Sequence, residues 1–181
     1  MAARLFAERG FHATSMQDLV RATGLTAGGL YHYIVSKDQL LVRICDELML
    51  PLLHEAAAIV TTDDPPAVQL RNLVRAWMAH VERKRDHVLV FSQERHVLER
   101  GPQWRRVRRQ RKQFEELLAE LLERAEAEGA LQLGDRDLAL RALLGMVNHT
   151  AVWFRPGGRL SADEIADGYL DLLSPKFRVS P

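Results

Sequence analysis

The sequence predicts an all-helical protein, with an N-terminal three-helix helix-turn-helix domain, a larger C-terminal helical domain, and about nine helices in total. Leu, Ala, Arg and Glu, which favour helices, dominate the 181 residues, whereas Gly and Pro number only 11 and 7. Apolar residues recur every three or four positions along most of the chain, as they do on one face of a helix. Hydrophobic residues make up 47% of the chain, which is ample for a buried core.

The first 38 residues carry the signals of three short helices. Residues 1–9 are predicted to be the end of a first helix, whose start we expect to be either truncated or unusually close to Met1. Thr14 or Ser15 can cap a second helix, and Gly24 permits the positive φ angle of a tight turn. Thr26 can cap a third helix of only about two turns. The first domain is therefore placed at residues 1–38.

The remaining residues, 39–181, are predicted to form the C-terminal ligand-binding and dimerisation domain. Ser36 can cap a long helix that reaches Val60. Helical spacing and stop signals predict further helices over residues 67–84, 87–99, 103–128, 135–154 and 161–173.

Membrane spans, a secretory leader and paired cysteines would each indicate a cellular compartment, and none of them is found in the sequence. No segment approaches the roughly 18 consecutive apolar residues that a membrane span requires. The N-terminus does not follow the pattern of a secretory leader. The single cysteine, Cys45, cannot form an internal disulfide and is expected to be a small buried hydrophobic residue. We therefore expect a protein of the reducing cytoplasm.

The two short helices joined at Gly24 have the shape of a helix-turn-helix motif. The second of them exposes small and polar aromatic side chains, as a helix does when it enters the DNA major groove. Taken alone, the run from Leu30 to Tyr33 is more often aromatic packing than a DNA contact. The full segment 15–37, SMQDLVRATGLTAGGLYHYIVSK, also resembles the DNA-binding domain of the TetR family of repressors.

The resemblance to the TetR family implies a role for each residue of this segment. Phosphate contacts would fix the position of the motif on DNA, and base contacts would select the sequence. Ser15 lies at a helix N-terminus, where a phosphate fits, and Gln17 can reach a base edge. The implied DNA-binding residues are Ser15, Gln17, Thr26, Ala27, Gly28, Gly29, Tyr31, His32, Tyr33 and Lys37.

One helix-turn-helix unit makes few base contacts, so useful specificity requires two units on a palindromic operator. The TetR family dimerises through its last two long helices, and the resemblance implies a homodimer with a four-helix interface. The expected interface consists of Leu140, Leu143, Leu144, Val147, Ala151, Phe154, Ile165, Tyr169 and Leu172. The alternative is that these apolar residues belong to the core of one protomer.

Three C-terminal segments, 91–98, 143–150 and 153–161, resemble one subgroup of the family. That subgroup includes FadR-type and related repressors of fatty-acid, aromatic-acid and sterol catabolism, which respond to acyl-CoA. The resemblance implies an effector cavity between the helices of residues 67–154. The expected walls are Trp77, Val81, Phe91, Glu94, His96, Phe114, Leu118, Met146, Asn148, His149 and Trp153. For each of these residues, plain core packing is the alternative interpretation.

A run of basic residues follows the helix breaker at 101–102, outside the helix-turn-helix segment. Arginine suits the recognition of phosphate, so part of this run is a candidate for holding the phosphates of CoA at the cavity mouth. The candidates are Arg105, Arg106, Arg109 and Lys112. A solvated helix face balanced by the glutamates downstream is one alternative, and extra contact with DNA phosphates is another.

These interpretations together predict a ligand-responsive transcriptional repressor that binds double-stranded DNA as a homodimer and is released by a small effector, preferably an acyl-CoA. Within the family, the alternative effector is a cationic or aromatic drug-like ligand of an efflux repressor. Outside the family, the alternative is a helical ligand-binding protein that does not bind DNA. An enzyme, a cofactor and a metal are not expected, because the sequence has no Gly-rich phosphate loop, no nucleophile elbow and no metal-ligand motif among its seven histidines.

Overall fold

The computed structural model describes residues 1–24 and 36–174, and in these two stretches the chain forms nine α-helices and one short 3-10 helix, with no strand. The helices are α1 (Ala2–Arg9), α2 (Met16–Thr23), α4 (Lys37–Val60), α5 (Pro66–Arg83), α6 (Arg85–Gln93), α7 (Arg95–Leu98), η1 (Pro102–Trp104), α8 (Arg105–Ala127), α9 (Arg136–Trp153) and α10 (Ala162–Leu173). No helix in the described part is both long and apolar enough to cross a bilayer. The predicted all-helical fold is therefore confirmed.

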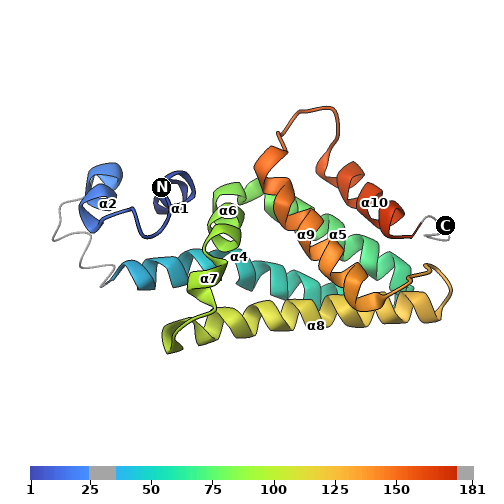
Figure 1. Cartoon of the computed structure of the whole chain (residues 1–181). Coiled ribbons are helices and arrows are strands. Elements are labelled where there is room, and N and C mark those ends of the chain that lie inside the picture. Colours follow the sequence, from blue (N-terminus) through green and yellow to red (C-terminus); the bar gives the residue numbers. More distant parts are fainter. Residues whose placement is uncertain (25–35, 175–181) are drawn as a thin grey trace.

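The short helices α1 and α2 lie at one end of the molecule, and the long helices α4 and α8 run from that end beneath α5, α9 and α10 (Figure 1). α10 packs on α5, while α8 packs on both α4 and α5. The N-terminal helices therefore sit on one end of a larger helical body rather than along its side.

Local capping explains where α2 begins and ends. The Ser15 hydroxyl accepts a hydrogen bond from the backbone N–H of Asp18, and the Asp18 carboxylate accepts one from the backbone N–H of Ser15. This reciprocal box satisfies two N–H groups that the helix cannot use itself. The Ser15 hydroxyl also donates to the Asp18 carboxylate, and this bond, together with the one from the Ser15 backbone N–H, holds the pKa of Asp18 below its usual range. Gly24 then ends the helix in the left-handed conformation, with φ of 68°.

The predicted helices over 87–99 and 103–128 are corrected by the structure. The first is two helices, α6 and α7, which meet at Glu94, and the second begins with the 3-10 turn η1 before α8. Glu94 adopts φ of −91° and ψ of 16°, outside the regular helix, and its side chain points to the N-terminal helices instead. The third helix of the predicted helix-turn-helix lies outside the described residues.

Helix α4 joins two hydrophobic cores. Its first half contributes Leu40 and Ile44 to an N-terminal core, and its second half contributes Leu48 and Leu52 to a C-terminal core. The N-terminal core consists of Ala3, Leu5, Phe6, Phe11, Leu19, Leu40, Leu41, Ile44, Cys45, Val90, Leu98, Trp104 and Val107. A movement of α4 therefore changes the packing in both cores, because interiors are close-packed and transmit strain.

The N-terminal core is completed by residues far away in the sequence. Val90 of α6, Trp104 of η1 and Val107 of α8 are buried in it, beside the first helices. The ring of Trp104 stands edge-on to that of Phe11, with 6.3 Å between the centroids, and Phe11 stands edge-on to Phe6 at 5.4 Å. The N-terminal helices are thus not a self-contained unit, because part of their core comes from residues beyond position 89.

Cys45 lies fully buried in the N-terminal core, as expected for a small hydrophobic residue. Burial raises the pKa of its thiol to about 12. The thiolate is the reactive form of cysteine, so Cys45 has no nucleophilic role at neutral pH.

Candidate functional site

A cavity of about 580 Å³ lies between α4, α5, α6, α8 and α9. This volume is within the range of small-molecule pockets. The apolar lining consists of Leu48, Met49, Leu52, Trp77, Val88, Phe91, Phe114, Leu140 and Leu144. The other lining residues are Ser92, Arg95, Arg111, Glu115, Asp137, Arg141, Gly145 and Asn148. The cavity thus has a large apolar wall and a cluster of charged and polar groups.

Two aromatic rings form the centre of the apolar wall. Trp77 of α5 and Phe114 of α8 meet edge to face, with 4.8 Å between the ring centroids and an interplanar angle of 74°. This arrangement places the positive edge of one ring against the negative face of the other. The wall is therefore a rigid apolar surface against which an acyl or ring group can pack.

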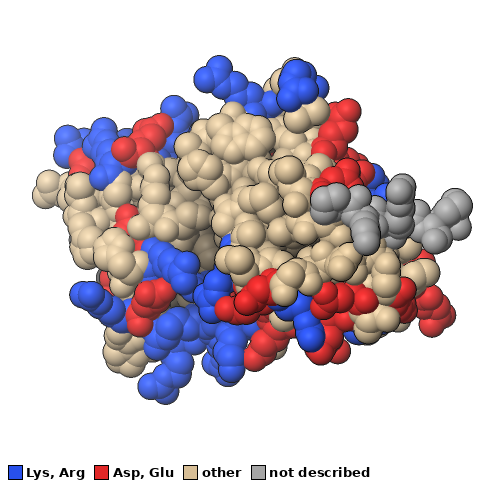
Figure 2. Space-filling view, turned by 45° about the vertical axis from the view of Figure 1, so that its right-hand side comes forward, with Lys and Arg blue, Asp and Glu red and all other residues tan. Residues whose placement is uncertain are grey.

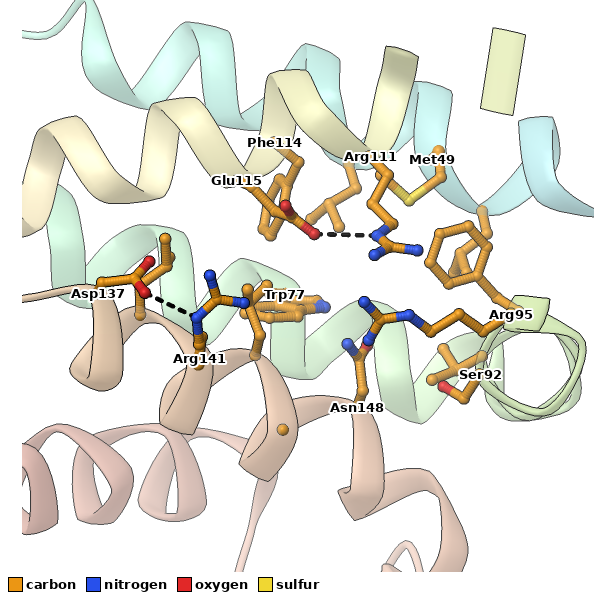
Figure 3. Close-up of a pocket in the computed structure, with 17 residues that line it drawn as sticks. Met49, Trp77, Ser92, Arg95, Arg111, Phe114, Glu115, Asp137, Arg141 and Asn148 are labelled. Atoms are coloured by element: carbon orange, nitrogen blue, oxygen red, sulfur yellow. Dashed lines mark hydrogen bonds and ion pairs between the residues drawn. The ribbon is translucent and has the colours of Figure 1, made fainter. Parts of the chain in front are cut away.

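Three arginines from three helices converge on the cavity: Arg95 of α7, Arg111 of α8 and Arg141 of α9 (Figure 3). Each arginine pairs with a carboxylate four positions away in the sequence. In each pair the arginine Nε donates the hydrogen bond. The distances are 2.8 Å from Arg95 to Glu99, 2.9 Å from Arg111 to Glu115 and 2.8 Å from Arg141 to Asp137. These ion pairs orient the three guanidinium groups at the cavity.

In these pairs the charged forms of the carboxylate and of the guanidinium stabilise each other. The hydrogen bond from Arg95 holds the pKa of Glu99 below its usual range, and the bond to Asp137 raises the pKa of Arg141. Within the described residues, the terminal guanidinium nitrogens of Arg95 and Arg141 make no hydrogen bond. Those nitrogens are the donors that a planar anion such as phosphate or carboxylate requires.

Only part of the predicted cavity wall is correct. Trp77, Phe91, Phe114 and Asn148 line the cavity. The residues that do not line it are Val81 and Leu118, which are buried in the core, Met146, which packs against that core, and His149 and Trp153, which are exposed. Glu94 and His96 face the N-terminal helices rather than the cavity. Helical spacing selects an inner face, but it does not distinguish a cavity wall from a solid core.

The basic run of α8 lies outside the cavity, apart from one member. Arg105, Arg106, Arg109 and Lys112 are exposed and do not line it; Arg106 pairs with Asp46 and Lys112 with Glu116, at 3.3 and 3.2 Å. Figure 2 shows this half of α8 as a basic cluster, followed by the acidic half of the same helix. The prediction that these four residues stand at the cavity is therefore corrected.

Of the arginines that do reach the cavity, Arg111 belongs to the predicted basic run but not to its four named candidates, and Arg95 and Arg141 were not predicted. One sequence signal could have found Arg111: it precedes Phe114 by three positions and Leu118 by seven, so the three share one helix face. Arg95 and Arg141 carried no such signal, because each is largely exposed and comes from a different helix. Their convergence depends on how α7 and α9 pack.

The predicted dimer interface is largely corrected. Leu143, Val147, Ala151, Phe154 and Ile165 are buried inside the protomer, so they cannot contact a partner. Leu140 and Leu144 line the cavity, and the Tyr169 hydroxyl bonds to that of Thr150 at 2.6 Å. Leu172 alone among the predicted residues is strongly exposed, at 73%.

A different apolar surface lies on the same two helices. Leu138, at the start of α9, and Val152 and Trp153, at its end, are 66%, 54% and 48% exposed, and Leu172 of α10 is exposed as well. Figure 2 shows that the surface above α8 is largely uncharged. Large apolar side chains that are exposed on the surface of a folded protein are candidates for contact with a partner.

Two predicted DNA-binding residues lie at the exposed start of α2. Ser15 and Gln17 are both exposed there, next to the N–H groups of the first turn. Helix N-termini bind anions, because their N–H groups and the helix dipole favour negative charge. The other predicted contacts up to position 35 lie outside the described residues: Thr26, Ala27, Gly28, Gly29, Tyr31, His32 and Tyr33.

Lys37 has a structural role that the sequence did not indicate. Its ammonium group donates to the backbone carbonyls of Phe11 (2.7 Å), His12 (3.3 Å) and Thr14 (2.9 Å). It also lies 4.6 Å from the centre of the Phe11 ring. All three ammonium donors are therefore used inside the protein, and Lys37 holds the turn between α1 and α2 rather than offering a free charge to phosphate.

Lys37→Met is expected to lower the free energy of unfolding by about 2 kcal/mol, because hydrogen bonds from a charged group to partly buried carbonyls are lost. Urea unfolding checks this value, with Arg43→Met, an exposed cation on the same helix, as the control. Operator affinity should fall without a change in its salt dependence. A slope of log K against log salt that becomes shallower by about 1, with stability unchanged, would instead assign Lys37 to a phosphate.

Comparison with known proteins decides the family. Residues 1–44 match the model described as "Bacterial regulatory proteins, tetR family", and residues 63–175 match that described as "Tetracyclin repressor-like, C-terminal domain". The chain belongs to the TetR family. The predicted helix-turn-helix at the N-terminus and the predicted C-terminal domain are both accounted for by these matches.

The relatives of this TetR-family protein are transcriptional regulators, not enzymes. HTH-type transcriptional repressor KstR2 of Mycolicibacterium smegmatis is 28% identical over 174 residues, covering 96% of this chain and 85% of KstR2. The structure of KstR2 of Mycobacterium tuberculosis has a TM-score of 0.86 at 27% identity and covers 95% of this chain and 88% of that one. AibR, solved in complex with isovaleryl coenzyme A and operator DNA, has a TM-score of 0.80 at 31% identity, with coverages of 96% and 94%.

Proposed function

We propose that this TetR-family regulator represses transcription as a homodimer on a palindromic operator and that an acyl-CoA releases it from DNA. The observation that carries the proposal is an apolar cavity on which the guanidinium groups of Arg95, Arg111 and Arg141 converge. A ligand with a hydrophobic part and several phosphates matches both features. The relative AibR, whose complex contains isovaleryl coenzyme A, supports the same class of ligand.

The apolar wall and the arginines of the cavity would bind different parts of the ligand. The acyl group would pack on Trp77 and Phe114, where it is removed from water. The phosphates would accept from Arg95 and Arg141, whose side chains are more than 60% exposed and thus close to solvent. Arginine binds phosphate through two parallel N–H donors, which fixes both position and orientation.

A cationic drug suits this cavity less well. The lining carboxylates, Glu115 and Asp137, are already paired with Arg111 and Arg141. A cation would have to displace those arginines, and the cost in free energy is largest at the partly buried Arg111–Glu115 pair, where Arg111 would lose this carboxylate. An anionic ligand instead needs only the terminal nitrogens, and it keeps the existing pairs.

The helices that line the cavity also reach the N-terminal core. α4 contributes Leu48 and Leu52 to the lining and Leu40 and Ile44 to that core, and α6 contributes Phe91 to the lining. A ligand that binds better to one position of α4 shifts the population toward that position. The spacing of the two DNA-binding units in the dimer would change with it, which moves them off a palindrome of fixed spacing.

The test is calorimetry on the purified protein with isovaleryl-CoA, phenylacetyl-CoA, dodecanoyl-CoA and a cationic dye. Binding of at least one thioester, together with its release of the palindrome upstream of the gene in a fluorescence anisotropy assay, supports the proposal. Tight binding of the dye alone would favour a drug-responsive repressor. Failure to bind any palindrome in that region would remove the DNA-binding part of the proposal.

Arg95→Gln combined with Arg141→Gln is expected to weaken acyl-CoA binding about 100-fold, because two charge-assisted hydrogen bonds are lost. Calorimetry measures this change, and operator affinity without ligand should stay as in the unmodified protein.

Two controls make that comparison specific. Arg105→Gln with Arg109→Gln removes the same charge from the exposed face of α8, outside the cavity, and should leave acyl-CoA binding unchanged. The N-acetylcysteamine thioester of the same acyl group lacks the phosphates, so it should bind both proteins equally. A fall of the same size in the control variant would assign the effect to net charge alone.

A further inference from the structure

Three potential metal ligands meet where the N-terminal helices rest on the body. His12 lies in the turn between α1 and α2, Glu94 lies between α6 and α7, and His96 lies in α7. Each offers one ligand atom, and these atoms all lie within 4.8 Å of one another. His12 is far from Glu94 and His96 in the sequence, and the three residues form no motif, so only the fold brings them together.

We propose that His12, Glu94 and His96 bind a divalent transition metal ion of the zinc class and that this ion clamps the α1–α2 turn to the α6–α7 junction. The site is separate from the cavity, since none of the three residues lines it. The proposal goes beyond the proposed acyl-CoA response and does not depend on it.

Glu94 is the residue that calls for a cation. It is only 5% exposed, yet no Lys, Arg or His pairs with it in the described part of the chain. One of its oxygens, Oε1, accepts a hydrogen bond from the backbone N–H of Phe11 at 2.8 Å. A buried carboxylate with one hydrogen bond and no counter-charge is costly, because it has lost most of its hydration. A bound cation would remove that cost.

The donor set indicates the kind of ion. Two imidazole nitrogens with one carboxylate oxygen is a set that Zn²⁺ binds at about 2.0–2.2 Å, usually with water in a fourth position. Ligand atoms around such a tetrahedral ion are about 3.3 Å apart, so distances within 4.8 Å need only small side-chain rotations. His12 and His96 are exposed and free to make them.

The surroundings orient the Glu94 carboxylate and give the His12 ring one packing contact. The Phe11 N–H that binds Glu94 Oε1 orients the carboxylate, as the second layer of a metal site does. The His12 ring stands edge-on to the ring of buried Phe11, with centroids 5.3 Å apart. The same short stretch of backbone therefore orients one ligand and carries another.

An ion here would act on the connection between DNA-binding unit and cavity. Glu94 is flanked by Ser92 and Arg95, which line the cavity. His12 follows Phe11, which packs in the N-terminal core. A metal bond between these segments would add to the stability of the folded state, because the unfolded chain does not hold the ligands together.

The test uses the full chain without a histidine tag, stripped with chelator. Co²⁺ is titrated as a spectroscopic probe, and Zn²⁺ is used to displace it. We expect one Co²⁺ per chain with the intense visible absorption of tetrahedral coordination. Zn²⁺ should raise the thermal unfolding midpoint of the unmodified protein.

The deciding variants are His12→Ala and His96→Ala, because both residues are exposed and their loss should not impair folding. Each should lower Co²⁺ and Zn²⁺ affinity at least about 100-fold, since loss of an outer partner alone costs 10–100-fold. His54→Ala, an exposed histidine of α4, is the matched control and should bind as the unmodified protein does.

Three outcomes would overturn the proposal: equal metal affinity in His12→Ala and the unmodified chain, an octahedral spectrum only, or no binding at millimolar metal. None of these measurements uses operator DNA or acyl-CoA. Failure of the metal site is therefore distinguishable from failure of the proposed repressor function.

Discussion

Trp153→Arg is expected to convert the proposed dimer into monomers, with a dimer dissociation constant raised at least about 30-fold. Trp153 is half exposed on α9, among other apolar side chains of α9 and α10. Exposed tryptophan is typical of the central residues of an interface, and a buried arginine without a partner opposes association. Analytical ultracentrifugation across a range of protein concentrations measures the change.

Operator binding provides a second measurement for Trp153→Arg. A monomer contacts only one half-site, so affinity for the full palindrome should fall toward that for a half-site. Leu50→Arg places the same charge at an exposed leucine of α4 and should leave the dimer intact. If Trp153→Arg stays dimeric at low concentration, the exposed face of α9 and α10 is not the interface.

Trp104→Ala is expected to lower the free energy of unfolding by about 3–5 kcal/mol, the usual range for a buried aromatic residue. Trp104 is 2% exposed and packs edge-on to Phe11, although it belongs to η1. The void would therefore open under α1 and α2, and operator binding should weaken more than acyl-CoA binding. Urea unfolding and hydrogen exchange measure the two effects.

Trp104→Phe serves as the matched variant, because it retains most of the apolar volume and should cost less. Hydrogen exchange should show faster exchange in α1 and α2 of the alanine variant, while α5 and the second half of α8 keep their protection. Uniform acceleration across all helices would mean that the N-terminal core has no separate local stability.

The fold could be predicted because its signals are local. Ser15, Asp135 and Ser161 each accept a backbone N–H at a helix start, as their residue types indicate. The family segment at 15–37 likewise lies in consecutive residues. Among the described residues, the largest departures from the predicted helix bounds lie at Glu94 and Trp104, where side chains bond to or pack on the N-terminal segment.

The candidate site was harder to predict, because its residues are defined by partners distant in sequence. Trp77 and Val81 share one face of α5, yet only Trp77 reaches the cavity. An apolar residue of α9 can face the protomer core, like Val147, or solvent, like Val152, and spacing does not separate these fates reliably. Lys37 was assigned by its charge, whereas its carbonyl partners became visible only in three dimensions.

The shared N-terminal core limits how the chain can be recombined with other regulators. A chimaera that transfers only residues 1–38 would carry Phe6 and Phe11 to a host without the matching Trp104 and Val107. The new junction would contain voids or clashes even if each donor folds well by itself. A hybrid regulator therefore has to take the segment from α6 to the start of α8 from the same donor as the N-terminal helices. For the same reason, natural substitutions on one side of this shared core have to be compensated by substitutions on the other.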